Sequence, residues 1–449
     1  MTKPGLQSPP ADPQIAVIGA GLAGLTAAYR LAQAGLKPRI FERYPMPGGL
    51  ARVIDVGGEP LEIFYHHLFT NDEAITALAK ELGLFGDIEW LPSKMGIWTG
   101  GRLWDFGTPA SLLRFRPLPW RDKLRFVIGT LRLQRSHDPT PFERVTAAQW
   151  IKEHMGTRVW KTVWGPLLHQ KFAEMSDEVA MVWLWRKIWL RGRSRSSSGM
   201  GERLGYLRGS FARVSEGLGE AISSMGGSLH LADPVRRVEK HPDGGFMIVT
   251  SEGAIKVDQV LAAVPVPDYL DIAGHLLQPG QRESLEALRA TGALCTLLEL
   301  NRSFMPYYWL NIADHNMPFG GLIEHTNYID RQRYGGKHLL YISNYLFPDH
   351  SLFHAGKQEI MQHYLTDLQR INPAFDLSWI DTIHHFRADY AQPVVTCGYR
   401  EQIPQMRTAI DNLYLCTMAQ IYPEDRGQNF AVEYGDRVAK LMLDDIRNG

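Results

Sequence analysis

Near its start, the chain places a strand, a glycine-rich turn and a helix in direct succession. The apolar run at residues 15–18 is typical of a buried parallel strand, and a helical pattern over residues 25–35 follows a GxGxxG segment. In this order the first glycine permits a tight turn, the second lets backbone approach a pyrophosphate, and the third lets helix and strand pack closely. The pattern predicts a dinucleotide-binding turn formed by Gly19, Gly21, Leu22, Ala23 and Gly24.

A second strand at residues 38–41 leads into Glu42, eighteen residues beyond Gly24. A carboxylate at this position accepts hydrogen bonds from both hydroxyls of an adenosine ribose and disfavours a 2′-phosphate. A second glycine pair then brings further backbone N–H groups and a cation toward a phosphate or the isoalloxazine edge, which favours FAD over NAD. We therefore expect FAD contacts from Glu42, Arg43, Gly48, Gly49, Leu50, Ala51 and Arg52.

Length, charge and cysteine content limit the class of protein. A chain of 449 residues exceeds what one hydrophobic core usually supports, so two or three packed units are expected. The 48 basic and 48 acidic residues cancel, which gives no indication of a nucleic-acid partner. Three separated cysteines without a CxxC predict neither a disulfide framework nor a metal site, and favour a cytoplasmic setting. No segment has the about 18 apolar residues of a spanning helix, and residues 1–14 lack a secretory apolar run.

A longer stretch carries a family resemblance. The segment GAGLAGLTAAYRLAQAGLKPRIFERYPMPGGLAR resembles the flavin-containing amine oxidase superfamily, which includes protoporphyrinogen oxidases, phytoene-type desaturases and, more distantly, UDP-galactopyranose mutases. Looser similarity continues in GYLRGS, PVRRV and RGQNFAVEYGDRVAKLML. The resemblance implies an α/β fold, in which a discontinuous Rossmann-like FAD-binding domain carries an inserted α+β substrate domain. The FAD domain is expected at 1–72, 200–267 and 405–449, and the substrate domain at 73–199 and 268–404. Alternating apolar residues predict a hairpin over 246–264 in the first domain, and strand-like runs are predicted at 293–300 and 338–346 in the second.

The same resemblance implies further FAD contacts near the C-terminus. A backbone group at Val235, in a strand expected over residues 234–238, would face the adenine. A helix starting at residue 428 would direct its N-terminus toward the flavin pyrimidine through Asn429, Phe430 and Ala431. Family members usually carry Gly followed by an acid for the ribityl chain where this chain has Thr417-Met418. That contact is absent or relocated, with compensation expected from Glu424, Asp425 and Arg426.

Candidates for chemistry are fewer. The loop holding His66 and His67 resembles a histidine loop near the flavin in UDP-galactopyranose mutases. Adjacent histidines on an extended chain point to opposite faces, so at most one would reach the flavin and they are poorly placed to share a metal. Lys171 is a candidate to orient a water or an acidic substrate, and Arg387 and Tyr390 are candidate substrate-lining residues. The alternatives are structural histidines and a solvent-facing lysine.

Two basic stretches stand out from the neutral total. Residues 114–135 hold seven basic side chains and one acid, interleaved with large apolar ones, and residues 186–195 hold five basic side chains and no acid. One interpretation of such stretches is peripheral contact with a membrane surface, which would be made through 114–135. Another is a site for a phosphorylated ligand. A solvated face with snorkelling stems is the other interpretation.

These features favour an FAD-dependent oxidoreductase that removes a hydride from a C–N or C–C bond of an apolar or amphipathic small molecule. No second strand–GxGxxG–helix unit is visible, because the glycines at 199–205 follow a serine run, so the substrate is expected to reduce the flavin directly. One alternative is a redox-neutral sugar-nucleotide mutase that uses reduced flavin. Another is a flavin-binding protein without turnover, suggested by Thr417-Met418. Substrate identity, electron acceptor and oligomeric state stay open.

Overall fold

The computed structural model describes residues 13–194 and 203–448. A five-stranded parallel sheet has the order β10-β2-β1-β14-β20. Its strands come from widely separated parts of the chain, so this Rossmann-like α/β unit is discontinuous, as expected. Their bounds are β1 (Ile15–Ile18), β2 (Arg39–Phe41), β10 (Ser228–His230), β14 (Gln259–Ala262) and β20 (Leu413–Leu415).

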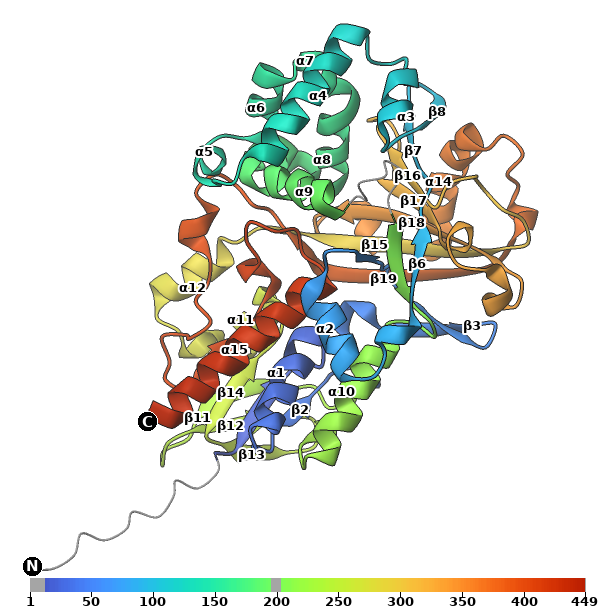
Figure 1. Ribbon diagram of the computed structural model, residues 1–449. Helices are drawn as coiled ribbons and strands as arrows, with labels where there is room; N and C mark the ends of the chain where they lie inside the picture. Colours follow the sequence, from blue (N-terminus) through green and yellow to red (C-terminus); the bar gives the residue numbers. More distant parts are fainter. Residues whose placement is uncertain (1–12, 195–202, 449) are drawn as a thin grey trace, which may run out of the picture.

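Helices cover one face of this sheet and a small antiparallel sheet covers the other. On the helical side α1 packs against α10 and α15, and α2 packs against α15 (Figure 1). The helices are α1 (Leu22–Gln33), α2 (Glu73–Glu81), α10 (Ala212–Ser224) and α15 (Gln428–Asn448). On the other side β11 (Arg237–Lys240), β12 (Phe246–Val249) and β13 (Ala254–Val257) share one apolar cluster with the parallel strands. The expected hairpin is confirmed, but the strand expected over 234–238 begins only at Arg237.

A seven-stranded mixed sheet forms the second layer, in the order β19-β15-β18-β17-β16-β7-β8. All its pairs are antiparallel except β16 with β7. The strand-like runs predicted at 293–300 and 338–346 form β15 and β18. The bounds are β7 (Met95–Thr99), β8 (Arg102–Asp105), β15 (Ala290–Leu300), β16 (Trp309–Ile312), β17 (Gly321–Glu324), β18 (His338–Leu346) and β19 (Ile380–Pro393).

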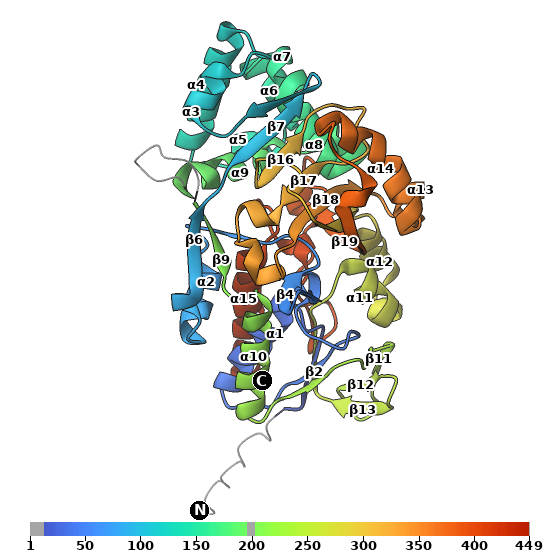
Figure 2. The ribbon, with the colours of Figure 1, turned by 90° about the vertical axis from the view of Figure 1, so that its right-hand side faces the viewer.

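Helices α3 to α9 gather at one end of the molecule, and β11 to β13 lie at the opposite end (Figures 1 and 2). A π-helical turn at Trp160–Trp164 joins α7 to α8. The bounds are α3 (Pro109–Arg114), α4 (Trp120–Arg135), α5 (Thr140–Glu143), α6 (Ala147–His154), α7 (Thr157–Val159), α8 (Gly165–Phe172) and α9 (Met181–Ser194). Within the two described ranges, none of the helices combines the length and apolar character that a membrane crossing requires.

The remaining elements join these layers. They are β3 (Val53–Val56), β4 (Glu59–Glu62), β5 (Leu68–Phe69), β6 (Ile88–Pro92), β9 (Arg203–Leu207), α11 (Val266–Ala273), α12 (Pro279–Glu286), α13 (Ser351–His354) and α14 (Lys357–Ile371). Strand β9 pairs with both β5 and β6. Strand β6 and helix α2 both follow residue 72, yet β6 pairs with a strand placed in the FAD domain and α2 packs on α15. The domain boundary expected at residue 72 therefore stays a prediction. The N-terminal tail and the glycines at 199–202 lie outside the described residues.

Candidate functional site

The first and third glycines of the turn are required by the packing of the chain itself. Gly19 has φ +101°, and a Cβ there would lie 2.6 Å from the Ala263 carbonyl oxygen. A Cβ on Gly24 would lie 2.1 Å from the Gly19 carbonyl oxygen. At Gly21 the backbone is ordinary, with φ −72°, and a Cβ would meet only the Gly49 Cα, at 3.9 Å. The open space beside Gly21 is therefore what a ligand approaching the backbone needs.

The two glycine segments meet at this turn. The Gly48 N–H donates to the Ala20 carbonyl at 2.8 Å, and a Cβ on Gly49 would lie 3.1 Å from the Gly21 Cα. A short 3₁₀ turn, Gly49–Ala51, carries Leu50 and Ala51 and leads into Arg52. The Arg52 guanidinium lies 3.4 Å from the centroid of the Tyr44 ring, a cation–π contact that holds its side chain against the segment after β2. The two segments therefore form one continuous backbone cradle.

Glu42 is held by backbone donors at the end of β2. Its carboxylate is 6% exposed, with Oε2 accepting the Ala20 N–H at 2.8 Å and Oε1 accepting the Tyr44 N–H at 3.0 Å. Each oxygen has a further lone pair for a ribose hydroxyl. The Asp233 N–H donates to the Glu42 carbonyl at 2.9 Å, so the segment that leads to half-buried Val235 runs alongside.

The Arg43 side chain is held in an ion pair with α11. Both terminal nitrogens of its guanidinium pair with the Asp268 carboxylate of α11, at 3.1 Å each. This bidentate pair satisfies the guanidinium within the protein. Its assignment as an FAD contact stays a prediction that concerns its backbone.

Two polar side chains lie at the N-terminus of α15, one with hydrogen-bond partners and one without a partner among the described residues. Asn429 Oδ1 accepts the N–H groups of Ala74 and Ile75, at 2.9 and 3.2 Å, and so serves the first turn of α2. Phe430 is packed against the largest apolar cluster, as is the Ala431 methyl group. Gln428 is 8% exposed, and within the described residues neither its Nε2 nor its Oε1 has a hydrogen-bond partner. Buried amides are normally paired, so this orphaned group fits a polar ligand at the helix N-terminus.

Four charged residues from three segments form what we call the lysine–aspartate cluster: Lys171, Lys187, Asp425 and Arg426. Lys171 on α8 and Lys187 on α9 donate to the same Asp425 Oδ2, at 2.6 and 2.7 Å. Arg426 donates to the Tyr345 hydroxyl at 2.7 Å. Among the described residues, the buried Asp425 Oδ1 and Arg426 Nε have no partner. Two lysines share one carboxylate, and Arg426 adds a third basic group without an ion-pair partner among the described residues, which favours an anionic or strongly polar ligand.

Burial and neighbouring charges set the protonation of this cluster. Burial, with Lys171 and Arg191 nearby, lowers the pKa of Lys187 to about 7 although Asp425 opposes the shift. Burial also lowers the pKa of Lys171. Burial opposes ionisation of Asp425, but the two ammonium groups hold its pKa below the ordinary value. Lys187 is therefore a member of the cluster that can exchange a proton near neutral pH.

The loop with His66 and His67 lies close enough to the lysine–aspartate cluster for its charges to affect both rings. His66 Nδ1 is 2.6 Å from the Phe64 carbonyl oxygen, and His67 Nδ1 is 3.1 Å from the Tyr308 hydroxyl. Burial lowers their pKa values to about 4 and about 3, with further lowering by Arg426 at His66 and by Arg191 and Lys187 at His67. Both rings are therefore neutral at pH 7. In the described parts of the chain, no three His, Cys, Asp or Glu side chains gather as metal ligands do.

An aromatic group adjoins the histidine loop. The Tyr65 and Trp309 rings meet edge to face at 4.9 Å between centroids, and the His67 ring lies 5.2 Å from Phe69 and 5.9 Å from Trp309. Tyr65 also exchanges a hydrogen bond with Ser343 of β18 at 3.0 Å. Apolar rings and basic groups thus lie in one neighbourhood.

The structure brings together some sequence candidates and separates others. His66, His67, Lys171 and the 424–426 segment, far apart in sequence, share the cluster region. Arg387 is exposed and donates to the Ala355 carbonyl oxygen, whereas Tyr390 is buried in the core of the helical end. No contact in the described chain joins either to the cluster, and their assignment stays a prediction.

Sequence reasoning missed Lys187, although it lies in the basic stretch at 186–195. The available signal was its position four residues after Trp183, which is 2% exposed. Residues four apart share a helix face, so Lys187 had to point inward. The neighbouring Arg186 pairs with Glu424 at 2.9 Å, and Arg195 lies outside the described residues. The first two basic residues of this stretch are therefore internal ion-pair partners, whereas Arg193 is exposed.

Comparisons with known proteins agree with this geometry. Residues 22–443 match the model of the flavin containing amine oxidoreductase family. A protein of Synechococcus elongatus assigned as a zeta-carotene desaturase is 24% identical over 96% of this chain and 98% of its own. A crystal structure assigned as a protoporphyrinogen oxidase from Exiguobacterium sp. superposes with TM-score 0.76 at 17% identity, over 96% of this chain and 99% of that one. Reduced UDP-galactopyranose mutase superposes with TM-score 0.71 at 16% identity, over 96% and 94%.

The family match spans nearly the whole described chain: it begins at Leu22, within the glycine turn, includes the lysine–aspartate cluster and ends in α15, at residue 443. A flavin dinucleotide can bind in the backbone cradle beside Gly21 and contact the Glu42 carboxylate and the unpaired Gln428 amide. The chain therefore belongs to the flavin containing amine oxidoreductase family and is an FAD-dependent oxidoreductase.

Proposed function

We propose that the enzyme oxidises a C–N or C–C bond of an apolar or amphipathic small molecule, with FAD as hydride acceptor. The observation that carries this proposal is that the aromatic group around His67 lies beside basic groups: the Arg191 guanidinium is 5.8 Å from the centroid of the Phe69 ring. Burial and the charges of Arg191 and Lys187 together lower the pKa of His67. Aromatic rings favour an apolar body, and the basic groups favour a polar or anionic end. The end-to-end similarity to a protein assigned as a zeta-carotene desaturase supports an apolar body.

The chain's own residues would hold the cofactor in a defined order. The backbone of Gly21 and Gly49 would take the pyrophosphate, and Glu42 would accept the ribose hydroxyls. The α15 N-terminus, with the unpaired Gln428 amide, would face the polar edge of the ring system. FAD supplies the hydride acceptor when bound.

The lysine–aspartate cluster would orient the substrate and carry a proton. Arg426 would hold positive charge beside the unpaired Asp425 oxygen, Lys171 would orient the substrate, and Lys187, with a pKa of about 7, would take up a proton released during oxidation. The neutral histidines leave the aromatic side without charge, which suits an apolar substrate body. In this proposal His66, His67 and Lys171 position the substrate.

A redox-neutral sugar-nucleotide mutase is the second candidate. It is favoured by the same excess of basic groups, which suits a diphosphate, and by the histidine loop beside them. The fold similarity to UDP-galactopyranose mutase is compatible with it but carries no substrate assignment. This candidate requires the flavin to be reduced beforehand, which gives a clean distinction. Family membership leaves the non-catalytic alternative without support.

The test is anaerobic mixing of the purified holoenzyme with a polyene, a porphyrinogen, a primary amine or a sugar nucleotide. We expect one of the first three to bleach the flavin absorbance without added reductant. Turnover of the sugar nucleotide only after dithionite reduction, with no bleaching by the others, would replace this proposal by the mutase. A Glu286→Ala variant, altered at an exposed position of α12, is the matched control for handling and folding.

We further propose a cytoplasmic setting, because Cys295, Cys397 and Cys416 are all unpaired thiols. Extraction of the native protein with its thiols blocked at lysis checks this. Three alkylated cysteines per chain are expected. A disulfide formed between any two of them would contradict the setting.

A further inference from the structure

Helix α4 carries apolar side chains on two opposite faces. Its inner face packs on the helical end through Gly129 and Leu133, and a Cβ on Gly129 would lie 2.6 Å from the Met155 side chain. The outer face exposes five large apolar side chains: Trp120 (69% exposed), Leu124 (52%), Val127 (40%), Ile128 (57%) and Leu131 (42%). Their spacing of i, i+4, i+7, i+8 and i+11 places them on one stripe. Only the inner stripe is covered by the protein.

This concentration is unusual within the molecule. Six of the nine exposed large apolar side chains in the described chain lie between Leu113 and Leu131, with Leu113 of α3 itself 76% exposed. The other three, Phe85, Leu231 and Leu377, are single and far apart in the sequence. Scattered apolar side chains need no explanation, whereas a contiguous exposed stripe marks an interaction surface. We call residues 113–135 the α3–α4 surface.

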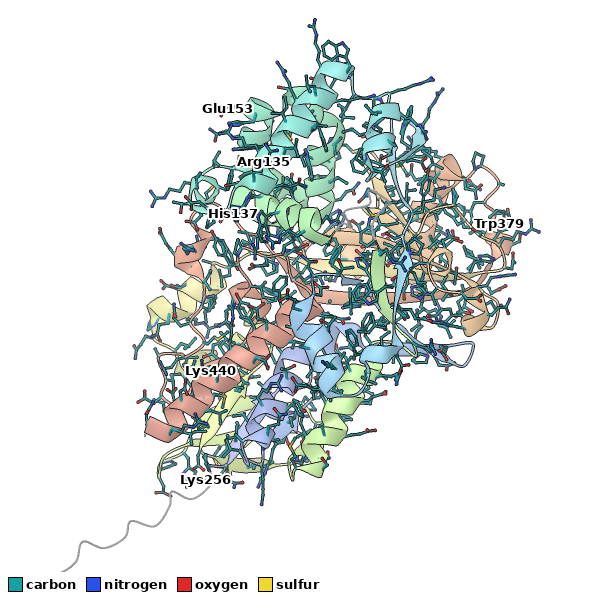
Figure 3. All side chains as sticks on the ribbon, in the orientation of Figure 1. Arg135, His137, Glu153, Lys256, Trp379 and Lys440 are labelled. Carbon is teal, nitrogen blue, oxygen red and sulfur yellow. The ribbon has the colours of Figure 1, made fainter. Side chains whose placement is uncertain are left out.

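The charges of the α3–α4 surface are basic and unpaired. Across the described residues, no carboxylate lies within 4.0 Å of any of its seven basic nitrogen groups; the single acid, Asp122, instead faces Arg158 of α7 at 3.9 Å. Lys123 donates to the Leu113 carbonyl at 2.6 Å. Arg135 lies at the C-terminal end of α4 (Figure 3). The basic members are Arg114, Arg116, Arg121, Lys123, Arg125, Arg132 and Arg135.

A hollow at the end of this stripe is lined by both apolar and basic side chains. Ile128, Leu131, Arg132, Arg135 and Ser136 line an open depression of about 500 Å³. Its wall offers aliphatic carbon beside two guanidinium groups. This arrangement suits a lipid headgroup phosphate with the start of its acyl chain.

We propose that the α3–α4 surface docks on an anionic lipid bilayer, with the apolar stripe of α4 inserted among the headgroups. An amphipathic helix that places Trp and Leu beside Arg and Lys lies in the plane of such an interface. Lipid phosphates supply the charge that the seven basic groups lack within the protein. The surface is at the end of the molecule remote from β11 to β13, so docking leaves the parallel sheet away from the bilayer (Figures 1 and 2).

The charge also argues against two other occupants. A second copy docked on the same surface by two-fold symmetry would oppose two sets of seven basic side chains, which repel. Nucleic acid would satisfy the charge but gives no partner to an aliphatic stripe, since single strands are bound through aromatic rings. The inference stands apart from the proposed reaction, because it uses none of the residues of the candidate site.

The test is sedimentation of the holoenzyme with vesicles of phosphatidylcholine alone or with about 30% phosphatidylglycerol. Binding is expected only with the anionic lipid and is expected to weaken as salt increases. The variant Leu124→Ser/Ile128→Ser/Leu131→Ser should lower the partition coefficient at least about tenfold, because three apolar groups no longer insert. The variant Arg121→Glu/Arg132→Glu should lower it by a similar factor.

The matched control is Phe85→Ser/Leu377→Ser, which removes two apolar side chains of comparable exposure, 50% and 52%, outside the surface. It should bind vesicles like the wild type. All variants should retain the flavin spectrum and the melting temperature, since each altered side chain is exposed. Equal binding to neutral vesicles, or wild-type binding by the serine variant, would overturn the proposal. A vesicle-independent dimer that the serine variant abolishes would likewise overturn it and assign the surface to a second copy.

Discussion

The two ends of the candidate site are built in opposite ways. The end that we propose for the adenosine, called the adenosine end below, comes from residues 15–52, where consecutive elements supply the turn, the acid and the second glycine pair. The lysine–aspartate cluster joins α8, α9 and the segment before α15, and Lys187 and Asp425 lie 238 positions apart in the sequence. A local motif therefore makes one end, and tertiary packing makes the other.

The two ends also differ in how far the chain satisfies its own polar groups. Glu42 has a backbone donor on each oxygen, and the glycine turn is closed by backbone hydrogen bonds. Near the cluster, Asp425 Oδ1, Arg426 Nε and both amide atoms of Gln428 lack a partner within the described residues. Unpaired buried groups are costly and concentrate where a ligand is bound. The comparison indicates that the adenosine end is preformed, whereas the other end is completed by its ligands.

Gly21→Val breaks the adenosine end with the largest expected effect. The side chain would fill the open space beside Gly49, where the pyrophosphate must approach. We expect FAD affinity to fall at least about 100-fold, equivalent to about 2.7 kcal/mol. The backbone at this position is ordinary, so the apoprotein should keep its circular dichroism spectrum and melting temperature. Fluorescence titration of the apoprotein with FAD measures the change.

Gly24→Ala is the contrasting variant. Its methyl group would lie 2.1 Å from the Gly19 carbonyl oxygen, so it should impair folding as well as cofactor binding. If Gly21→Val unfolded the apoprotein and Gly24→Ala did not, the two glycines would have the opposite roles to those inferred. Full FAD retention by Gly21→Val would place the pyrophosphate elsewhere.

Glu42→Ala tests the same end with a smaller effect. A hydrogen bond to a charged group contributes about 1.5 to 3 kcal/mol, so FAD should bind about tenfold more weakly or worse. Glu42→Gln, which keeps one acceptor oxygen, should fall between wild type and alanine. Released flavin counted after gel filtration gives the order. Unchanged FAD content in the alanine variant would remove Glu42 from the ribose site.

Sequence reasoning reached the adenosine end because its geometry depends on neighbouring residues. The strand, turn and helix periodicities and the hairpin of β12 and β13 were all predictable from local pattern, as were β15 and β18. The start of β11 was not, because Val235 lies in an extended segment held by the Asp233 contact to Glu42. Local pattern also fails for Asn429, whose side chain serves a helix that begins at residue 73.

The cluster could be predicted only in parts. Lys171 and the 424–426 segment were candidates on separate grounds, and nothing in either stretch indicates that they meet at one carboxylate oxygen. The pairing depends on how α8, α9 and α15 are placed, which is set by long-range packing. Arg387 differs from these candidates: it is exposed on β19, apart from the cluster, and its assignment as a substrate-lining residue stays a prediction.

Lys187→Met tests the comparison from the cluster end, through the pH dependence of stability. The folded pKa of Lys187 is about 7 and its ordinary value is 10.5, so between these values the unfolded chain binds one more proton than the native protein. Native stability from this group therefore rises with pH across that window, by up to about 1.4 kcal/mol per pH unit, and the penalty is complete below pH 7. The variant should lose this slope, so its melting temperature should exceed that of the wild type most at pH 7 and least near pH 10. Lys440→Met, on the exposed face of α15 (Figure 3), should show the wild-type slope. Parallel pH profiles for wild type and Lys187→Met would show that Lys187 stays charged throughout, and the proton-carrying role would then fall to another group in the cluster.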